Sequence, residues 1–186
     1  MGIAADLSYV HRRANPFQRA MQAFASTRPG AWLFSKVLRH LDDLVGRLSR
    51  GRTTVPGLLA GLPVIDVTTT GRKSGQRRTS HLISVPHGET LALLGTNFGQ
   101  PGTPAWVLNL EADPHAHVRF KGRTVDVRAR AASEEEAAEV FARSRQVYGG
   151  YAKYQQRISG RRIRVFILEP VRPSAASPQM DAASGR

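Results

Sequence analysis

Apolar residues near the N-terminus recur at the spacing of an α-helix. Five of them follow one another at steps of three and four residues, which places them on one helix face. Basic residues lie between them, so residues 1–55 are predicted to form a basic helical segment. Such a segment either packs on its own domain or lies on an anionic membrane surface. The five positions are Leu33, Val37, Leu41, Leu44 and Leu48.

The pattern changes between residues 62 and 131, where short apolar and β-branched runs are separated by turn signals. The runs LPVIDVTTT, HLISV and TLALLGT predict strands, and PHGE between the last two predicts a turn. HAHVRF and RTVDVRARA predict a hairpin joined by the two residues KG. Between these regions TPAWVLNLEADP predicts a short helix, with Pro104 near its first turn and Pro114 just past its end.

The remaining segments predict one more helix, one more strand and a tail. Ser133 and Glu136 have the spacing of a capping box at the start of SEEEAAEVFARSRQVY, and RIRVFILEP predicts a strand. Residues 171–186 lack periodicity and predict a disordered tail. The chain therefore divides into a helical segment to residue 55, a β-rich domain over residues 56–170, and the tail.

The predicted strands, arranged mainly as hairpins with helices inserted and flanking, indicate a mainly β (α+β) fold. An antiparallel sheet or a small barrel fits this order of elements. A doubly wound α/β fold does not fit, because it would alternate strand and helix.

Composition narrows the function. The chain has no cysteine, which excludes disulfides, thiolate nucleophiles and cysteine-ligated metal centres. A net charge of +13 predicts attraction to anions. No apolar run reaches the roughly 18 residues of a membrane-spanning helix, and the N-terminus has neither a secretory signal nor a myristoylation motif. We expect a cytoplasmic protein, with peripheral contact between residues 1–50 and the anionic inner face of the cell membrane as the sharper alternative.

The stretch TTTGRKSGQRRTS, residues 68–80, concentrates positive charge around two glycines. It is neither a P-loop nor a dinucleotide fingerprint, because the glycine spacing of both motifs is absent. Glycine allows backbone amides to approach an anion, and arginine, lysine and hydroxyl groups add hydrogen bonds to it. A nucleic-acid backbone, a lipid headgroup and an anionic cofactor are all candidate ligands, and a solvated hairpin turn is the plain alternative.

Four motifs in the same order resemble the deazaflavin-dependent nitroreductase family of actinobacteria. They are VTTTGRKSGQRRTSHL, LLGTNFGQPGTPAWVLNLEADP, YGGYAKYQQR and IRVFILEP, and the resemblance covers about residues 60–170. It implies a split β-barrel like that of FMN-binding split-barrel proteins. It also implies coenzyme F420, an 8-hydroxy-5-deazaflavin that carries a ribityl phosphate and an oligoglutamate tail.

The resemblance also implies which residues bind the coenzyme. The basic stretch would hold the phosphate and the carboxylate tail, and the loop that follows residue 95 would lie beside the ring. Core packing is the alternative role for Trp106, and anchoring of a loop is the alternative for Asn109. The implied coenzyme-binding residues are Arg72, Lys73, Ser74, Gly75, Arg78, Thr79, Thr96, Asn97, Trp106 and Asn109.

Tyr148, Tyr151 and Tyr154 are spaced by three, which on a helix gives one stripe of aromatic side chains. The resemblance places them, with Thr96, at the catalytic pocket, where they would orient a quinone or nitroaromatic acceptor or donate a proton. Ordinary packing is the alternative. The chain departs from the family at His81, where proline is frequent, and at residues 96–99, where a Ser–Leu/Lys–Gly–Gly loop occurs in some members.

Two rival functions stay open at this stage. One is an FMN-binding split-barrel protein, and the other is a basic nucleic-acid-binding module. The second is disfavoured because most aromatic residues sit in apolar contexts, so no nucleic-acid partner is expected. His115 and His117 would share a strand face, but no carboxylate motif accompanies them and no metal is expected. There is also no G-x-S-x-G nucleophile elbow.

Overall fold

The computed structural model describes residues 2–9, 15–27, 29–30, 32, 62–158 and 160–171. The predicted amphipathic helix over residues 33–48 and the predicted tail beyond Val171 lie outside the described residues. The boundary at residue 55 does so too, and these three expectations stay predictions.

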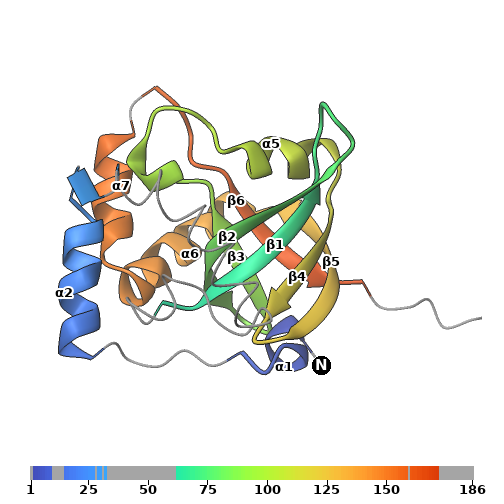
Figure 1. The fold of residues 1–186 in the computed structure, drawn as a ribbon, viewed down its shortest axis with the longest axis horizontal. Coiled ribbons are helices and arrows are strands. Elements are labelled where there is room, and N and C mark those ends of the chain that lie inside the picture. The colour runs from blue at the N-terminus through green and yellow to red at the C-terminus, as the bar shows by residue number, and fades with distance from the viewer. Residues whose placement is uncertain are drawn as a thin grey trace, which may run out of the picture.

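Within the described residues six strands close into a barrel in which every neighbouring pair is antiparallel (Figure 1). Their order around the barrel is β1-β2-β3-β6-β5-β4, and β4 returns to β1. Closure leaves no strand edge of the barrel open, and it decides between the antiparallel sheet and the small barrel that the sequence left open. The bounds are β1 Val64–Thr70, β2 Arg77–His87, β3 Thr90–Leu94, β4 His115–Phe120, β5 Arg123–Ala131 and β6 Val165–Pro170.

The predicted strands are all present, and the strand β2 is longer than its apolar run. It starts at Arg77 because Thr70 pairs with Arg77 and Thr68 pairs with Thr79 across the hairpin. The basic stretch is therefore mostly strand, and its turn is confined to residues 71–76, here called the basic loop. In the β4–β5 hairpin Lys121 and Gly122 both have positive φ, as its predicted two-residue turn requires.

Helices cover both ends of the barrel and one flank. In Figure 1 the short α1 and α5 lie at opposite ends of the barrel, and α2 stands beside α7. Ile3 of α1 and the following Leu7 are fully buried in the barrel core, so the extreme N-terminus is part of the barrel. No helix among the described residues is long and apolar enough to cross a membrane. The bounds are α1 Ile3–Asp6, α2 Pro16–Ala25, α5 Ala105–Ala112, α6 Glu134–Val147, α7 Gly150–Arg157 and the 3-10 turn η1 Asn97–Gly99.

The helix that precedes the tyrosines ends earlier than predicted. The capping box is confirmed, since Ser133 and Glu136 exchange side chain–backbone hydrogen bonds at the start of α6. Tyr148, however, has extended backbone angles at the end of α6, and α7 starts only at Gly150. A Cβ at Gly150 would lie 2.3 Å from the Tyr148 ring, so glycine is needed for this junction. The single helical stripe of three tyrosines was therefore wrong: Tyr151 and Tyr154 share α7, and Tyr148 precedes it.

Two apolar clusters fix the position of α7. The first fills the barrel, with Ile65, Val67 and Leu93 at its centre. The second lies on the outer face of the barrel, where Val85 and Ile167 pack against α6, α7 and the three tyrosines. Along β1, β3 and β6 alternate residues serve the two clusters, as the period of two requires, whereas β4 and β5 contribute only to the first. The tyrosines are thus held against the outside of the barrel.

Candidate functional site

A cleft of about 980 Å³ is lined along one side by residues 77–83 of β2, while β1 contributes Val64. The basic loop lies at one part of its lining and the three tyrosines at another, while α2 and the loop after β3 supply further walls. Of the residues that the sequence predicted, all but Gly75 line this one cleft. They are Arg72, Lys73, Ser74, Arg78, Thr79, Thr96, Asn97, Trp106, Asn109, Tyr148, Tyr151 and Tyr154.

The basic loop is a tight turn held by its own backbone. The Gly71 N–H donates to the Gln76 carbonyl at 2.8 Å, and the Gly75 N–H donates to the Gly71 carbonyl at 2.8 Å. Gly75 has φ +65°, a conformation that favours glycine. A Cβ at Gly71 would come within 2.9 Å of the Ser74 hydroxyl oxygen. The turn therefore favours glycine at both positions, at Gly75 because of its positive φ and at Gly71 because a side chain would crowd Ser74.

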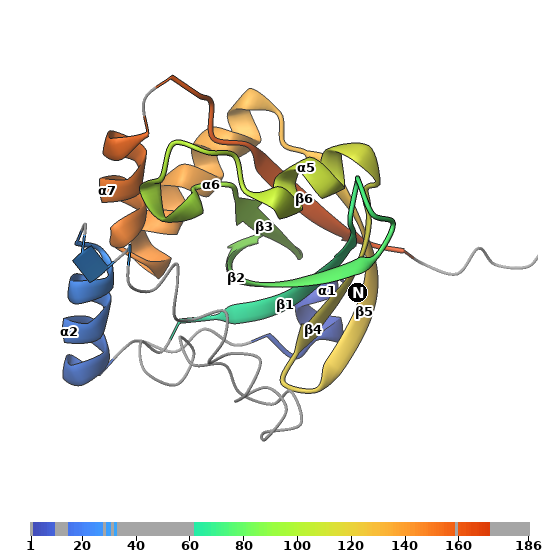
Figure 2. The same cartoon turned by 45° about the horizontal axis from the view of Figure 1, so that its top comes forward.

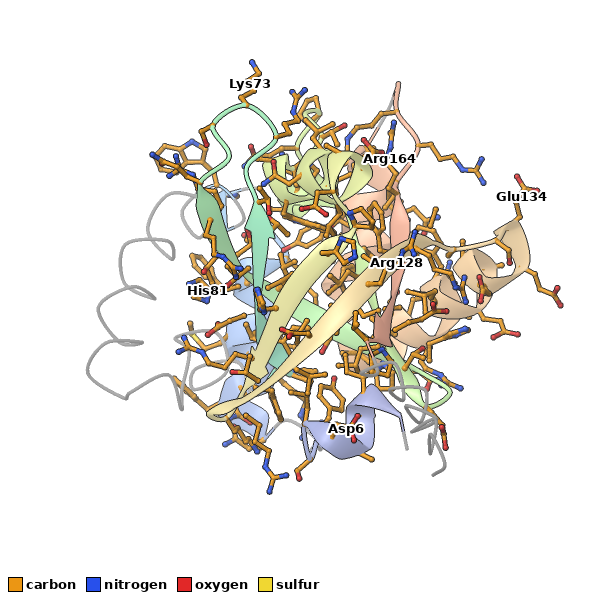
Figure 3. All side chains as sticks on the ribbon, turned by 90° about the vertical axis from the view of Figure 1, so that its right-hand side faces the viewer. Asp6, Lys73, His81, Arg128, Glu134 and Arg164 are labelled. Carbon is orange, nitrogen blue, oxygen red and sulfur yellow. The ribbon has the colours of Figure 1, made fainter. Side chains whose placement is uncertain are left out.

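The positive charge of this region has no acidic partner among the described residues. No described carboxylate forms an ion pair with Arg72, Lys73, Arg77 or Arg78, and Arg78 donates only to the side-chain oxygen of Gln76, at 3.1 Å. Figure 3 shows Lys73 at the tip of the hairpin, pointing away from the protein. Uncompensated cations around a turn of glycines attract an anionic ligand.

Asn109 of α5 ties the basic loop to the barrel. Its side-chain oxygen accepts from the Arg72 N–H at 3.1 Å, and its side-chain NH₂ donates to the Thr69 hydroxyl at 3.0 Å. Asn109 is 6% exposed, so these bonds are shielded from water. Asn109 therefore anchors the basic loop, which was the alternative to its predicted role in coenzyme binding. Trp106, one turn earlier, packs edge-on against Phe166 and presents part of its surface to the cleft.

The loop after β3 has an unusual backbone that Arg161 holds in place. Asn97, Phe98 and Gly99 have φ of +48°, +55° and +77° in succession. The Arg161 guanidinium donates to the carbonyls of Gly95, Thr96 and Gln100 at 2.9, 3.1 and 3.2 Å. Residues held in such sparsely populated regions cluster at functional sites. Sequence reasoning missed Arg161, because it contacts a loop more than sixty residues away.

The tyrosines form one aromatic cluster with edge-to-face packing. Ring centroids lie 5.7 Å apart for Tyr148–Tyr151, 5.9 Å for Tyr148–Tyr154 and 6.5 Å for Tyr151–Tyr154. Tyr151 donates to the Ile83 carbonyl at 3.3 Å, Tyr154 donates to the Ala25 carbonyl at 3.2 Å, and the Tyr148 and Tyr154 hydroxyls lie 3.1 Å apart. Because Tyr154 gives its proton to Ala25, Tyr148 is the donor between those two.

Burial raises the pKa of all three tyrosine hydroxyls above the ordinary value, and for Tyr148 and Tyr151 the neighbouring Tyr154 raises it further. A phenol with a raised pKa stays neutral at physiological pH. Burial would also destabilise the tyrosinate that proton transfer leaves behind. Both roles that the sequence left open for these hydroxyls, orientation of an acceptor and proton donation, stay predictions.

α7 also holds the end of α2 against the cleft. Lys153 donates to the Ser26 hydroxyl at 2.9 Å, and Arg157 donates to the Ser26 carbonyl at 2.7 Å. Tyr154 bonds to Ala25 in the same place. Figure 2 shows α2 and α7 side by side, away from α1. Met21 and Ala25 line the cleft, so α2 is one of its walls.

His81 also lines the cleft and belongs to a polar row across three strands. Its Nδ1 lies 2.7 Å from the Asp66 carboxylate, and Arg119 donates to the other oxygen of that carboxylate at 2.6 and 2.9 Å. Burial alone would raise the pKa of Asp66, but the bonds from His81 and Arg119 outweigh it and lower that pKa below its ordinary value. The carboxyl is therefore ionised. The sequence marked His81 only as a departure from the family.

The other predicted histidines do not build a metal centre. Among the described residues no group of three or more potential ligands could hold a metal ion. His115 pairs with Asp113 at 3.0 Å, and His117 pairs with Asp126 across the β4–β5 hairpin. No carboxylate motif was visible in the sequence around these histidines, because β-pairing supplies one of the two partners. Each histidine has one carboxylate and no third ligand.

The cleft suits a ligand that is flat and apolar in one part and strongly anionic in another. Leu62, Val64 and the tyrosine rings supply apolar walls, and the basic loop supplies cations. A deazaflavin ring joined to a phosphate and a glutamate chain has this form. The residues present therefore fit the coenzyme that the sequence resemblance implied.

Comparison with known proteins gives a match to one family model and to curated relatives. The family model described as F420H(2)-dependent quinone reductase matches residues 41–170. The F420H(2)-dependent quinone reductase Rv1261c of Mycobacterium tuberculosis is 29% identical over 138 residues, which is 70% of this chain and 89% of that protein.

Solved structures agree. An F420-H2 dependent reductase (FDR-A) superposes with a TM-score of 0.53 at 33% identity, over 57% of this chain and 94% of the other. A domain-swapped dimer superposes with a TM-score of 0.54 at 30% identity, over 76% of this chain and 99% of the other.

Proposed function

The chain belongs to the F420H(2)-dependent quinone reductase family and is an F420-dependent oxidoreductase, and we propose that the cleft on β1 and β2 is where coenzyme and acceptor meet. The observation that carries this proposal is the convergence of twelve predicted site residues, from segments up to eighty residues apart, on one cleft. Neither the FMN alternative nor the nucleic-acid alternative is favoured by the comparisons.

Residues of the basic end would hold the anionic part of the coenzyme. Arg72, Lys73 and Arg78 are unneutralised by described carboxylates, and the hydroxyls of Ser74 and Thr79 lie in the same lining. Charge-assisted hydrogen bonds from such groups to phosphate or carboxylate are the stronger kind. Gly75 would contribute through its backbone. Asn109 would act on the coenzyme through the loop that it anchors.

The opposite part of the cleft would hold the ring and the acceptor. Trp106, Thr96 and Asn97 would border the ring, although the Asn97 amide already donates to the Gly102 carbonyl at 2.9 Å. The bound coenzyme supplies a hydride, so the protein needs to bind, orient and exclude water. The tyrosine cluster would form the wall against which a quinone lies. Nitroaromatics, which are also flat and accept a hydride, are the second acceptor class to assay.

One experiment tests the coenzyme assignment. We expect F420 to bind the purified protein at low micromolar concentration or better and FMN to bind much more weakly, as followed by fluorescence titration. Lys73→Ala should weaken F420 binding about tenfold or more, since one charge-assisted bond contributes about 1.5–3 kcal/mol. The loss should grow with the length of the glutamate tail.

Lys121→Ala is the matched control, because Lys121 is an exposed lysine in the β4–β5 turn and does not line the cleft. Equal or tighter FMN binding would overturn the coenzyme assignment. If the affinity for F420 does not depend on the length of its glutamate tail, the basic loop does not hold that tail.

We also propose that α2 makes peripheral contact with an anionic membrane. Phe17 at the start of α2 is 63% exposed, and Trp32 beyond its end is 63% exposed. Large exposed apolar side chains beside Arg19, on a protein of charge +13, suit the interface of an anionic bilayer. The predicted cytoplasmic location stays a prediction.

A further inference from the structure

Phe98, in the turn η1 after β3, is an exposed aromatic residue on a strained backbone. Its φ of +55° and ψ of +24° lie in the left-handed region, where a Cβ crowds the following carbonyl oxygen. Its neighbours Asn97 and Gly99 have positive φ as well. The side chain is 37% exposed, so part of its apolar surface stays in water. Fold stability alone does not explain a residue that combines backbone strain with an exposed ring.

The rest of the loop holds Phe98 in this conformation. On one side Arg161 donates to three main-chain carbonyls within residues 95–100. On the other side Gly99 packs so closely on α7 that a Cβ there would lie 3.3 Å from the Tyr154 Cα. Figure 1 shows η1 as the yellow-green turn beside the orange helix α7. Because both flanks are fixed, the direction in which the Phe98 side chain leaves the main chain is fixed too.

Phe98 lies at the tyrosine part of the cleft, whose lining it shares with Tyr154, Met21 and Ala25. Its ring packs edge-on against Tyr154, with centroids 6.3 Å apart and an interplanar angle of 69°. Tyr154 cannot turn away without breaking the bond from its hydroxyl to the Ala25 carbonyl. Phe98 therefore extends the aromatic wall of the tyrosines towards the loop after β3, and its exposed surface borders the space that an acceptor would occupy.

We propose that Phe98 is a specificity-determining residue for the acceptor; this rests on the proposed function. Its ring gives a flat aromatic acceptor a packing surface beside Tyr154, and its bulk excludes acceptors whose substituents stand out of the ring plane. A flat quinone against the tyrosine wall covers the exposed part of the Phe98 ring, so that apolar surface leaves water on binding. The strained backbone is retained because it directs this ring into the cleft.

The kinetic test compares naphthoquinone with the bulky di-tert-butyl-benzoquinone at saturating reduced F420. Phe98→Ala should raise the KM for naphthoquinone about two- to tenfold, as expected for the loss of one aromatic contact, with a smaller change in kcat. The same variant should admit the bulky quinone, so the ratio of the two kcat/KM values should fall by about tenfold or more. Phe98→Leu keeps bulk without an aromatic face, so it should bind naphthoquinone weakly and still exclude the bulky quinone. A merely structural role would lower both kcat/KM values together.

Two further readouts do not use turnover. Naphthoquinone should bind the protein loaded with oxidised F420 more weakly in Phe98→Ala and Phe98→Gly than in the wild type, by the same factor in both, as measured by calorimetry. Only glycine adopts the backbone of residue 98 without strain, so the melting temperature of Phe98→Gly should exceed that of Phe98→Ala by about 2–4 °C. Lys121→Gly is the matched control: Lys121 also has positive φ, at +48°, but lies outside the cleft lining, so the acceptor ratio should not change.

The outcomes separate this inference from the proposed function. An unchanged acceptor ratio in Phe98→Ala and Phe98→Gly, with F420 binding intact, would overturn the role of Phe98 and leave the coenzyme assignment standing. Naphthoquinone binding of equal strength in wild type and both variants would overturn it as well. Failure of the wild-type protein to bind F420 would instead overturn the proposed function. Should Phe98→Ala fail to fold by circular dichroism, Phe98→Gly, which relieves the strain, and Phe98→Leu decide the matter.

Discussion

Asn109 shows how one buried amide sets the geometry of the basic loop. Both ends of its side chain are used, one for the Arg72 N–H and one for the Thr69 hydroxyl. Removing it would leave the Arg72 N–H and the buried Thr69 hydroxyl without this partner, and a buried polar group that loses a partner costs more than the bond itself contributes. The loop would then lose its fixed position relative to α5, and with it the alignment of Arg72 and Lys73.

Asn109→Ala should therefore lower both stability and coenzyme affinity. We expect the free energy of unfolding to fall by about 1–3 kcal/mol, as measured by urea denaturation. F420 affinity should fall as well, as measured by fluorescence titration. Thr69→Val removes only one of the two partners and should have a smaller effect on both. Wild-type stability together with weaker F420 binding would instead indicate that Asn109 contacts the coenzyme directly.

Changing each of the three tyrosines to phenylalanine should affect stability differently at the three positions. Tyr151 and Tyr154 donate to main-chain carbonyls, so each variant should lose about 1 kcal/mol of stability. Tyr148 donates only to another tyrosine among the described residues, so Tyr148→Phe should keep its melting temperature more nearly. If this cluster is the acceptor wall, all three variants should alter the Michaelis constant or turnover with a quinone and leave F420 affinity unchanged. Wild-type kinetics in all three would place the acceptor elsewhere.

At this scale the sequence could indicate chemistry but not contacts. The cations, glycines and tyrosines are local patterns that composition and spacing reveal. Arg161, Lys153 and the His81–Asp66 pair become visible only when strands and loops far apart in the chain are brought together. The motif order supplied most of the candidate site, and the register between β1, β2 and β4 supplied the rest.

Among the helices and strands, α6 has the clearest local sequence signal, its capping box. Its first turn is also hydrogen-bonded to the barrel. Glu136 caps the Ser133 N–H, and its two carboxylate oxygens also accept from Arg130 of β5 at 2.6 and 2.7 Å. The hydrogen bonds from Arg130 and from the Ser133 backbone lower the pKa of Glu136 to about 2. The helix start was predictable because a capping box is local. Its attachment to Arg130 of β5, which also donates to Glu169 of β6 at 2.7 Å, was not.

Glu136→Gln should reveal this bond through its pH dependence. Because the pKa of Glu136 is depressed in the folded protein, its stabilising effect is complete above about pH 4.5 and is lost as the pH falls towards 2. Solvent screening limits the effect to about 1 kcal/mol at pH 7. Urea unfolding at a series of pH values should show wild type and variant converging in acid. A constant difference at every pH would mean that the lost bond does not depend on ionisation.

The element scale also explains where the predicted boundaries moved. β2 extends into the polar stretch RRTS because pairing with β1 overrides the low strand propensity of arginine. The three tyrosines do not share one helix because α6 ends before Tyr148 and α7 starts at Gly150, where the Tyr148 ring occupies the space beside the glycine. Periodicity alone reports neither pairing nor such a junction.

At the scale of the whole molecule, barrel closure and charge act together. Closing β4 onto β1 places Arg119 beside Asp66, and α7 against the outer face of the barrel brings the tyrosines within the same cleft as the basic loop. The class of fold followed from the run of hairpins, but closure depends on long-range pairing that no local pattern encodes. The net charge of +13 surrounds this cleft with a field that attracts anionic ligands.

The same charge bears on the proposed contact between α2 and an anionic membrane. Anionic vesicles should bind the full chain at low salt, and zwitterionic vesicles should bind it weakly, as measured by co-sedimentation. Vesicle binding that depends on charge alone would be screened by about 0.5 M salt. Insertion of apolar side chains would add a component of binding that resists salt. Phe17→Ser should remove that component, since Phe17 is 63% exposed on α2. Val171→Ser is the matched control, because Val171 is also exposed but follows β6. If both variants bind anionic vesicles as the wild type does, α2 is not the membrane contact, and its role is to wall the cleft.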